Sequence, residues 1–154
     1  MSTYVVVLTI HSWMRWAALT LGAAATANAF VGRRENPARP GRSRWDTFFM
    51  AAVDLQVLLG LFLYFGLSPS TTAGMNDLQA ALHTPVLRFW TITHVAMMFG
   101  AAVLVRVGRV LAMNAPTPEA RRTRRGIAFA LALLIMIAGI PWPGTIVGRP
   151  LFRL

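Results

Sequence analysis

Four long apolar segments, separated by polar connections, dominate this sequence of 154 residues. They cover approximately residues 4–31, 47–67, 87–113 and 126–143. A helix that crosses a bilayer needs about 20 predominantly apolar residues, because each residue advances the helix by about 1.5 Å. The first three segments have this length, and the fourth has it only if Trp142 lies at the membrane interface. We therefore predict an all-α integral membrane protein, a bundle of four transmembrane helices.

The composition excludes most soluble classes of protein. Hydrophobic residues make up 56% of the chain and charged residues 13%, which is far from the balance of a soluble domain. The four helices and their connections use almost every residue, so residues 1–154 are expected to form a single membrane domain. No machinery for converting a substrate is visible, and we expect no independent catalytic activity. The chain contains no Cys, which excludes disulfides and thiolate metal sites.

The arginines predict the topology of the chain. All 15 basic residues are Arg, and 11 of them lie in or beside the connections that precede the second and fourth segments. They are Arg33, Arg34, Arg39, Arg42, Arg44, Arg106, Arg109, Arg121, Arg122, Arg124 and Arg125. Cytoplasmic connections of membrane proteins carry such an excess of basic residues. We therefore place both termini and the Arg-free connection 68–86 on the outer, periplasmic side of a bacterial inner membrane. Topology explains the basic runs, so the expected partner is the lipid bilayer and not a nucleic acid.

Polar residues inside the apolar segments are the candidate functional residues, because each is costly in hydrocarbon and needs a compensating role. The first three segments contain such residues, and the fourth contains none. They are His11 and Arg15, then Asp54, Gln56 and Tyr64, then Thr91, Thr93 and His94. Any site is therefore expected to lie among the first three helices.

His11 and His94 are expected at the same depth in the membrane. The first and third helices run inward in parallel, and each His lies about seven residues, or ~10 Å, inside its helix. The antiparallel second helix places Gly60 or Leu61 near this level, and the missing side chain of Gly60 leaves space there. Two neutral imidazoles on different helices of a bundle are the usual ligands of a b-type haem. We therefore predict haem b between His11 and His94. The alternative is that each imidazole only makes hydrogen bonds within the bundle.

Arg15 lies one helical turn below His11 and needs a partner, because an unpaired guanidinium at this depth costs several kcal/mol. The favoured partner is Asp54, which reaches a similar depth from the opposite direction. A haem propionate or a quinone carbonyl is the alternative. With Gln56 and Tyr64, these two residues form the predicted buried polar network. Asp54 and Gln56 are about 200° apart on the helical wheel and are expected on opposite flanks of the second helix.

Two further residues lie near the outer surface. Arg88 is at the outer end of the third helix, where it can contact either a propionate or lipid headgroups. His83 lies in the connection 68–86 and is expected to be a solvated surface imidazole.

Several short motifs occur together between residues 5 and 143. They are His-Ser-Trp-Met-Arg-Trp at 11–16, Gln-Val-Leu-Leu-Gly at 56–60 with Tyr64, Arg88-Phe89, His94 with Met98, and Ile-Pro-Trp-Pro at 140–143. This pattern resembles a family of small four-helix bacterial membrane proteins that are often labelled cytochrome b. The chain departs from the family at Asp54 and Thr93, where many members carry His and Glu. His11 and His94 thus remain as the metal ligands.

The predicted function is electron transfer by a b-type haem protein or subunit. A quinone or a larger redox or photosynthetic membrane complex is the candidate partner. The alternative is a cofactor-free accessory subunit of a larger respiratory or photosynthetic complex, which would pack through small-residue helix faces. The polar residues are also compatible with a chlorin pigment bound through one His. The size of the chain, although not its motifs, is similar to that of the haem-containing four-helix protoporphyrinogen oxidases.

Overall fold

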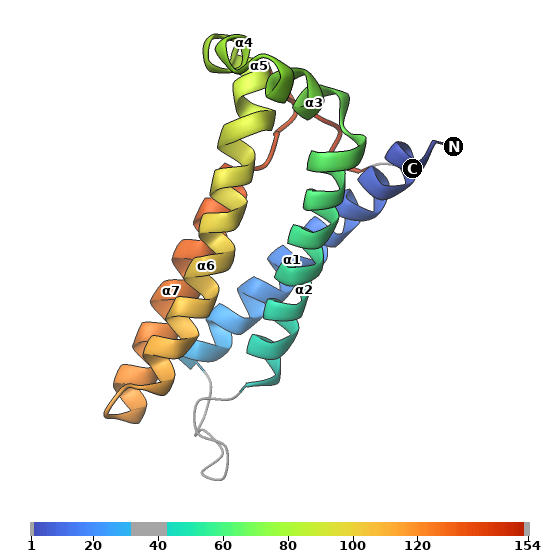
Figure 1. Cartoon of the computed structure of the whole chain (residues 1–154). Coiled ribbons are helices and arrows are strands. Elements are labelled where there is room, and N and C mark those ends of the chain that lie inside the picture. The colour runs from blue at the N-terminus through green and yellow to red at the C-terminus, as the bar shows by residue number, and fades with distance from the viewer. Residues whose placement is uncertain (1, 32–42, 153–154) are drawn as a thin grey trace.

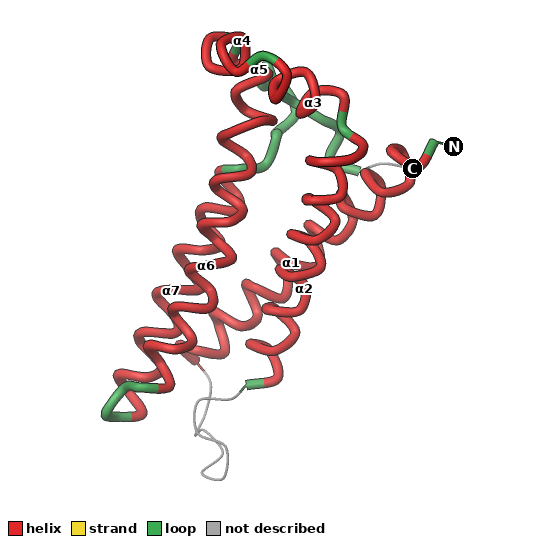
Figure 2. Tube along the Cα trace, in the orientation of Figure 1, coloured by secondary structure: helices red, strands yellow, loops and turns green. Residues whose placement is uncertain are grey.

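The computed structural model describes residues 2–31 and 43–152, and these residues are almost entirely helical (Figures 1 and 2). Four long helices form its framework: α1 (Thr3–Val31), α2 (Arg44–Phe62), α6 (His94–Met113) and α7 (Pro118–Ala138). α1 packs against α2 and α7, and α6 packs against α7 and α2. The four helices therefore form a ring in which α1 and α6 are diagonally opposite. α1 crosses the other helices obliquely (Figure 1).

Three segments of the described chain are long and apolar enough to cross a membrane: Thr3–Val31, Arg44–Leu67 and Pro85–Met113. The second includes the π-helical turn η1 (Leu63–Leu67), and the third begins with α5 (Pro85–Arg88) and the π-helical turn η2 (Phe89–Thr93). Their bounds differ by at most three residues from the first three predicted segments. Length and composition thus indicate a membrane protein.

The predicted bounds of the fourth helix, residues 126–143, were wrong at both ends. α7 begins at Pro118, because Thr117 caps it by accepting a hydrogen bond from the Ala120 N–H at 3.1 Å and Pro118 fits its first turn. It ends at Ala138, and the following Pro-Trp-Pro is not helical, since a proline nitrogen has no hydrogen to continue the ladder. Charged side chains occupy the first part of α7, so its apolar part is limited to residues 126–138.

The connection after η1 folds into short helices, α3 (Pro69–Asn76) and α4 (Leu78–His83), followed by α5. Ser68 and Asp77 cap the first two through their side-chain oxygens. α3, α4 and α5 lie at one end of the molecule with the start of α1 and with the segment that follows α7 (Figure 1). The end of α1, the start of α2 and the α6–α7 connection lie at the opposite end (Figure 1). The connection 68–86 thus lies at the same end as the start of α1 and the segment after α7, as predicted. Arg33, Arg34, Arg39 and Arg42 of the predicted basic connection lie outside the described residues.

The packed core lies toward the α6–α7 connection. Phe49 and Phe129 are fully buried there and contact each other edge to face, with ring centroids 5.4 Å apart. Buried alanines line the remaining helix contacts, among them Ala18, Ala25 and Ala132, and small side chains let helices approach closely. The other half of the bundle contains a cavity.

Candidate functional site

His11 on α1 and His94 at the start of α6 face each other across the diagonal of the ring. Their ring centroids are 6.5 Å apart and their ring planes are inclined at 69°. Both line one cavity. The structure therefore brings the two histidines together, which agrees with the common level that the helical rise predicts.

His94 has one ring nitrogen engaged and one available. Its Nδ1 lies 2.8 Å from the carbonyl oxygen of Gly139, just after α7. A carbonyl oxygen only accepts hydrogen bonds, so Nδ1–H is the donor and Nε2 of the neutral ring keeps its lone pair. Histidines that ligate metals show this pattern, in which the second nitrogen is oriented by a carbonyl group.

His11 is held by Gln56 of α2. The nitrogens His11 Nε2 and Gln56 Nε2 are 3.2 Å apart, and Gln56 is buried. As placed, the Gln56 Nε2–H donates to the lone pair of His11 Nε2, and His11 Nδ1 carries the ring hydrogen. With the amide oxygen and nitrogen exchanged, His11 Nε2–H donates to Gln56 Oε1, and Nδ1 keeps the lone pair. In the described part of the chain, His11 Nδ1 is buried and has no hydrogen-bond partner. Each imidazole thus presents one uncommitted nitrogen.

The cavity encloses about 140 Å³ and its lining is mostly apolar. Besides the two histidines, its lining includes Gln56, Gly60 and Arg15. A Cβ atom on Gly60 would lie 3.3 Å from Cε1 of His11, which is tighter than an ordinary contact. The prediction that Gly60 leaves room for the histidines is therefore confirmed.

The segment after α7 closes the cavity on the side of α1. The Arg15 guanidinium donates hydrogen bonds to the Leu151 carbonyl oxygen at 2.6 Å and to Ser12 Oγ at 3.3 Å. The indole N–H of Trp16 donates to the same carbonyl at 3.1 Å. Phe152 stacks on Trp16, with ring centroids 5.4 Å apart. The sequence did not predict that the segment after α7 packs against α1, because an irregular segment has no periodic pattern of apolar residues.

The prediction that Asp54 is the partner of Arg15 was wrong. Asp54 forms an ion pair with Arg106 on α6, and its side chain is half exposed. The physical reason is the rotation of α2: with Gln56 turned toward His11, Asp54 points to the outside, as expected for residues about 200° apart. The opposite orientation of the two side chains is thus confirmed, but Asp54 does not belong to a buried network.

The remaining members of the predicted network form separate pairs. The Tyr64 hydroxyl donates to the Thr91 carbonyl oxygen at 3.0 Å and so joins η1 to η2. Tyr64 also lines the cavity, but its hydroxyl is directed to η2 and not to the histidines. π-helical turns often accompany functional sites, and η2 ends at the residue before His94.

The cationic residues at the cavity differ from the predicted set. Arg88 is exposed and does not belong to the cavity lining. Arg149 does belong to it, and its guanidinium lies 5.1 Å from the centroid of the Trp90 ring. The Arg149 backbone N–H donates to the Pro141 carbonyl oxygen at 3.0 Å, which folds the C-terminal segment back. His83 is exposed at the end of α4, as predicted.

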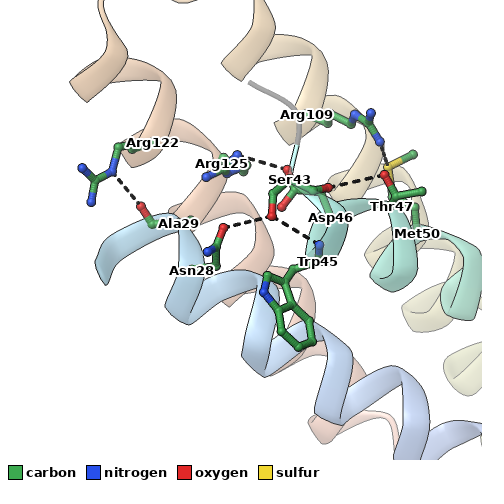
Figure 3. A network of polar contacts seen from close by, with 10 residues as sticks. All are labelled: Asn28, Ala29, Ser43, Trp45, Asp46, Thr47, Met50, Arg109, Arg122 and Arg125. Carbon is green, nitrogen blue, oxygen red and sulfur yellow. Dashed lines mark hydrogen bonds and ion pairs between the residues drawn. The ribbon is translucent and has the colours of Figure 1, made fainter. Parts of the chain in front are cut away.

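A second polar cluster lies at the opposite end of the bundle (Figure 3). Arg125 of α7 donates to Asp46 of α2 at 3.1 Å, and both side chains are buried. Ser43 caps α2 and bonds to Asn28 of α1 at 3.0 Å. From the sequence, Arg125 was interpreted only as an indicator of topology. An acidic residue at the start of an apolar helix, Asp46, was the feature that could have predicted its partner.

The described residues contain no group of three or more His, Asp or Glu side chains that could hold a metal ion. Two imidazoles do not complete the coordination of a metal ion, so any metal held at this point would need further ligands from another molecule.

Comparison of the chain with protein-family models, with curated proteins and with solved structures finds no match. The function must therefore be argued from the site itself.

Proposed function

We propose that the protein is a membrane-bound electron-transfer protein that binds haem b, with His11 and His94 as the axial ligands. The observation that supports this proposal best is the pair of facing imidazoles in one cavity, with ring centroids 6.5 Å apart. Imidazole nitrogens bind metal ions at ~2 Å, so two imidazoles at this spacing are close enough to hold the same iron ion.

The donor chemistry also fits a haem. A site made only of protein ligands normally needs at least three or four of them, whereas a porphyrin brings four nitrogens of its own and needs only axial ligands. Each imidazole has one ring nitrogen outside these hydrogen bonds, and its other nitrogen is oriented by Gln56 or by the Gly139 carbonyl. For His11 we propose the tautomer in which Nε2–H donates to Gln56 Oε1 and Nδ1 keeps its lone pair for the iron. Such orienting partners fix the ring and raise its basicity. Haem supplies one-electron redox chemistry when bound.

The other cavity residues would tune and shield the site. A mostly apolar lining lowers the local dielectric, which strengthens the charge interactions at the site. Arg15 and Arg149 line the cavity, and guanidinium groups bind carboxylates such as propionates through paired hydrogen bonds. We propose that Arg15 and Arg149 bind the haem propionates. Arg88 is not assigned this role, because it does not line the cavity. The missing side chain of Gly60 leaves room for the His11 ring.

We further infer that the apolar part of α7 is a fourth membrane crossing and that both termini lie on the outer side of a bacterial inner membrane. α7 packs along α6 and α1, and the arginines of its first turns lie at the end of the bundle where Arg44 begins α2. The positive-inside rule places this end in the cytoplasm. A C-terminal alkaline phosphatase fusion should be active and a C-terminal GFP fusion dark. The reverse pattern would overturn the orientation.

An electron-transfer role requires a donor and an acceptor. In this orientation the cavity lies near the outer surface, within reach of a membrane quinone or of a larger redox or photosynthetic complex. These are the partners we propose.

The test is the reduced-minus-oxidised absorbance spectrum of the detergent-purified protein. Wild-type protein is expected to show b-type bands, and His11→Ala and His94→Ala are each expected to abolish them, because both axial ligands are needed. His83→Ala is the matched control, since His83 is exposed outside the cavity, and it should keep the spectrum. A purified wild-type protein without a Soret band, after expression with adequate haem, would refute the proposal.

The second candidate is a cofactor-free accessory subunit of a larger membrane complex. It is favoured by the fact that each imidazole already links two parts of the chain: His11 bonds to α2 through Gln56, and His94 bonds to Gly139. In that case the histidines act only as packing contacts. The same alanine variants would then lower the thermal stability of a protein that has no visible absorbance.

A further inference from the structure

The surface between α2 and α6 carries an outward-facing ion pair. Asp54 of α2 is bonded to Arg106 of α6, and the two side chains are 52% and 45% exposed. The contrast with Asp46 and Arg125 is clear, since those side chains are 0% and 4% exposed. Asp54 and Arg106 thus neutralise each other, but about half of the pair remains uncovered by this chain.

This ion pair lies well inside the spanning segments. On α2, Asp54 is eight residues beyond Asp46 and thirteen residues before Leu67, which correspond to ~12 Å and ~20 Å along the helix. Arg106 belongs to the segment Pro85–Met113. Ionisable side chains at such depths almost always face protein or a water-filled cavity, because hydrocarbon does not solvate them. An outward-facing pair at this position therefore needs a covering surface.

The rest of the surface is apolar. Exposed side chains on the same faces include Leu58 and Phe62 on α2 and Val103 and Val110 on α6, which are 52%, 62%, 56% and 49% exposed. The patch around Asp54 and Arg106 therefore combines an apolar area with one negative and one positive side chain. Arg109 lies one turn further along α6, where its guanidinium contacts Met50 of α2.

We propose that this α2/α6 surface, defined by Asp54, Leu58, Arg106 and Val103, is the interface between two copies of the chain. A two-fold axis perpendicular to the membrane keeps every residue at its depth, and Asp54 and Arg106 share a depth because they are bonded to each other. The axis therefore brings Asp54 of one copy opposite Arg106 of the second copy, and the reverse. The four charges then alternate and cover one another. This interface depends on the membrane placement but not on haem.

Cysteine cross-linking in native membranes tests the surface directly, because the chain has no Cys of its own. Leu58→Cys should give an oxidised product with the mass of two copies. Leu134→Cys on α7 is the control: Leu134 is 61% exposed and lies nine residues beyond Arg125, while Leu58 lies twelve beyond Asp46. Equal cross-linking of the two variants, or a product whose mass is not that of two copies, would overturn the proposal.

Charge variants then separate contacts within a copy from contacts between copies. Asp54→Leu and Arg106→Leu, each combined with Leu58→Cys, should reduce dimer cross-linking more than about tenfold, because each interface then holds two like charges and no partner. Differently tagged copies of the two variants, expressed together, should recover a mixed dimer. That dimer retains one Arg106 opposite one Asp54, although neither copy contains both residues.

Recovery in the mixed dimer is possible only if the charges meet between copies. Absence of recovery, in variants that keep the wild-type melting profile, would refute the interface. If a single charge variant does not fold, the proposal is still tested by comparing Leu58→Cys with Leu134→Cys in the otherwise unchanged chain. Stronger cross-linking of Leu58→Cys supports the interface, and equal cross-linking refutes it.

Discussion

The two ends of the bundle use buried polar residues in opposite ways. Near the start of α2, the charges of Asp46 and Arg125 are buried and paired with each other. At the other end, His11 and His94 line a cavity, and the described residues offer no partner to His11 Nδ1. A buried pair within the chain fixes how helices pack, whereas a buried polar atom without a partner is costly unless a ligand satisfies it. Asp46 Oδ1 is also buried without a hydrogen-bond partner among the described residues, so what distinguishes the end with the histidines is its cavity.

The comparison predicts the largest loss of stability at Asp46 and Arg125. Asp46→Leu or Arg125→Leu leaves a buried charge without its partner, which costs about 3–5 kcal/mol in comparable pairs. The double variant should recover much of this loss. Chemical unfolding in detergent measures both effects, and the double-mutant cycle isolates the pair. Single losses below about 1 kcal/mol, the range of exposed ion pairs, would show that this end is not the stabilising one.

The next effect is expected at Gln56. Gln56→Leu removes the group that orients His11, and loss of such an orienting partner typically lowers the affinity for the metal group about 10–100-fold. Haem titration of the purified protein measures this change. Gln79→Leu is the matched control, because Gln79 is exposed on α4, and its affinity should equal that of the wild type. Equal affinities for both variants would mean that Gln56 contributes only to packing.

A smaller effect is expected at Arg15. A positive charge beside a redox centre stabilises the added electron, and Arg15 lines the cavity with both histidines. Arg15→Leu should therefore lower the haem midpoint potential by an amount on the order of 1 kcal/mol, or about 40 mV for one electron. Arg88→Leu, which changes an Arg outside the cavity, should leave the potential unchanged. A potentiometric titration compares the two variants, and a shift of equal size in both would contradict the assignment.

The smallest effect is expected at the C-terminal segment. Phe152 stacks on Trp16 and contacts Trp13, and such aromatic pairs contribute about 0.5–1.5 kcal/mol beyond their buried area. Phe152→Ala should lower stability by this amount and shift the tryptophan fluorescence to longer wavelength, since both indoles become more exposed. Phe48→Ala, at a 55% exposed position on α2, is the control. Unchanged fluorescence in Phe152→Ala would show that the segment does not cover the cavity in solution.

The sequence alone predicted the three long apolar helices and which of their polar residues lie at the same level along the bundle. Length and hydropathy predicted four spanning segments, and three of them correspond to helices long and apolar enough to cross a membrane. The helical rise brought His11, His94 and Gly60 to one level. These are local properties, because each follows from counting residues along a single helix. The fourth helix was placed less well, since a Thr cap and a Pro extend it into charged sequence that hydropathy assigned to the connection.

Only the tertiary structure decided which polar residues meet. Asp54 and Arg15 satisfy the depth criterion for a pair, yet Asp54 bonds to Arg106, while Arg15 bonds to Leu151 and Ser12. Arg149 lines the cavity because the C-terminal segment folds back toward Pro141. No periodic pattern in the sequence predicts this path. The physical reason is that helical rise fixes position along a helix axis, whereas rotation about the axis and the path of irregular segments are fixed by packing between helices.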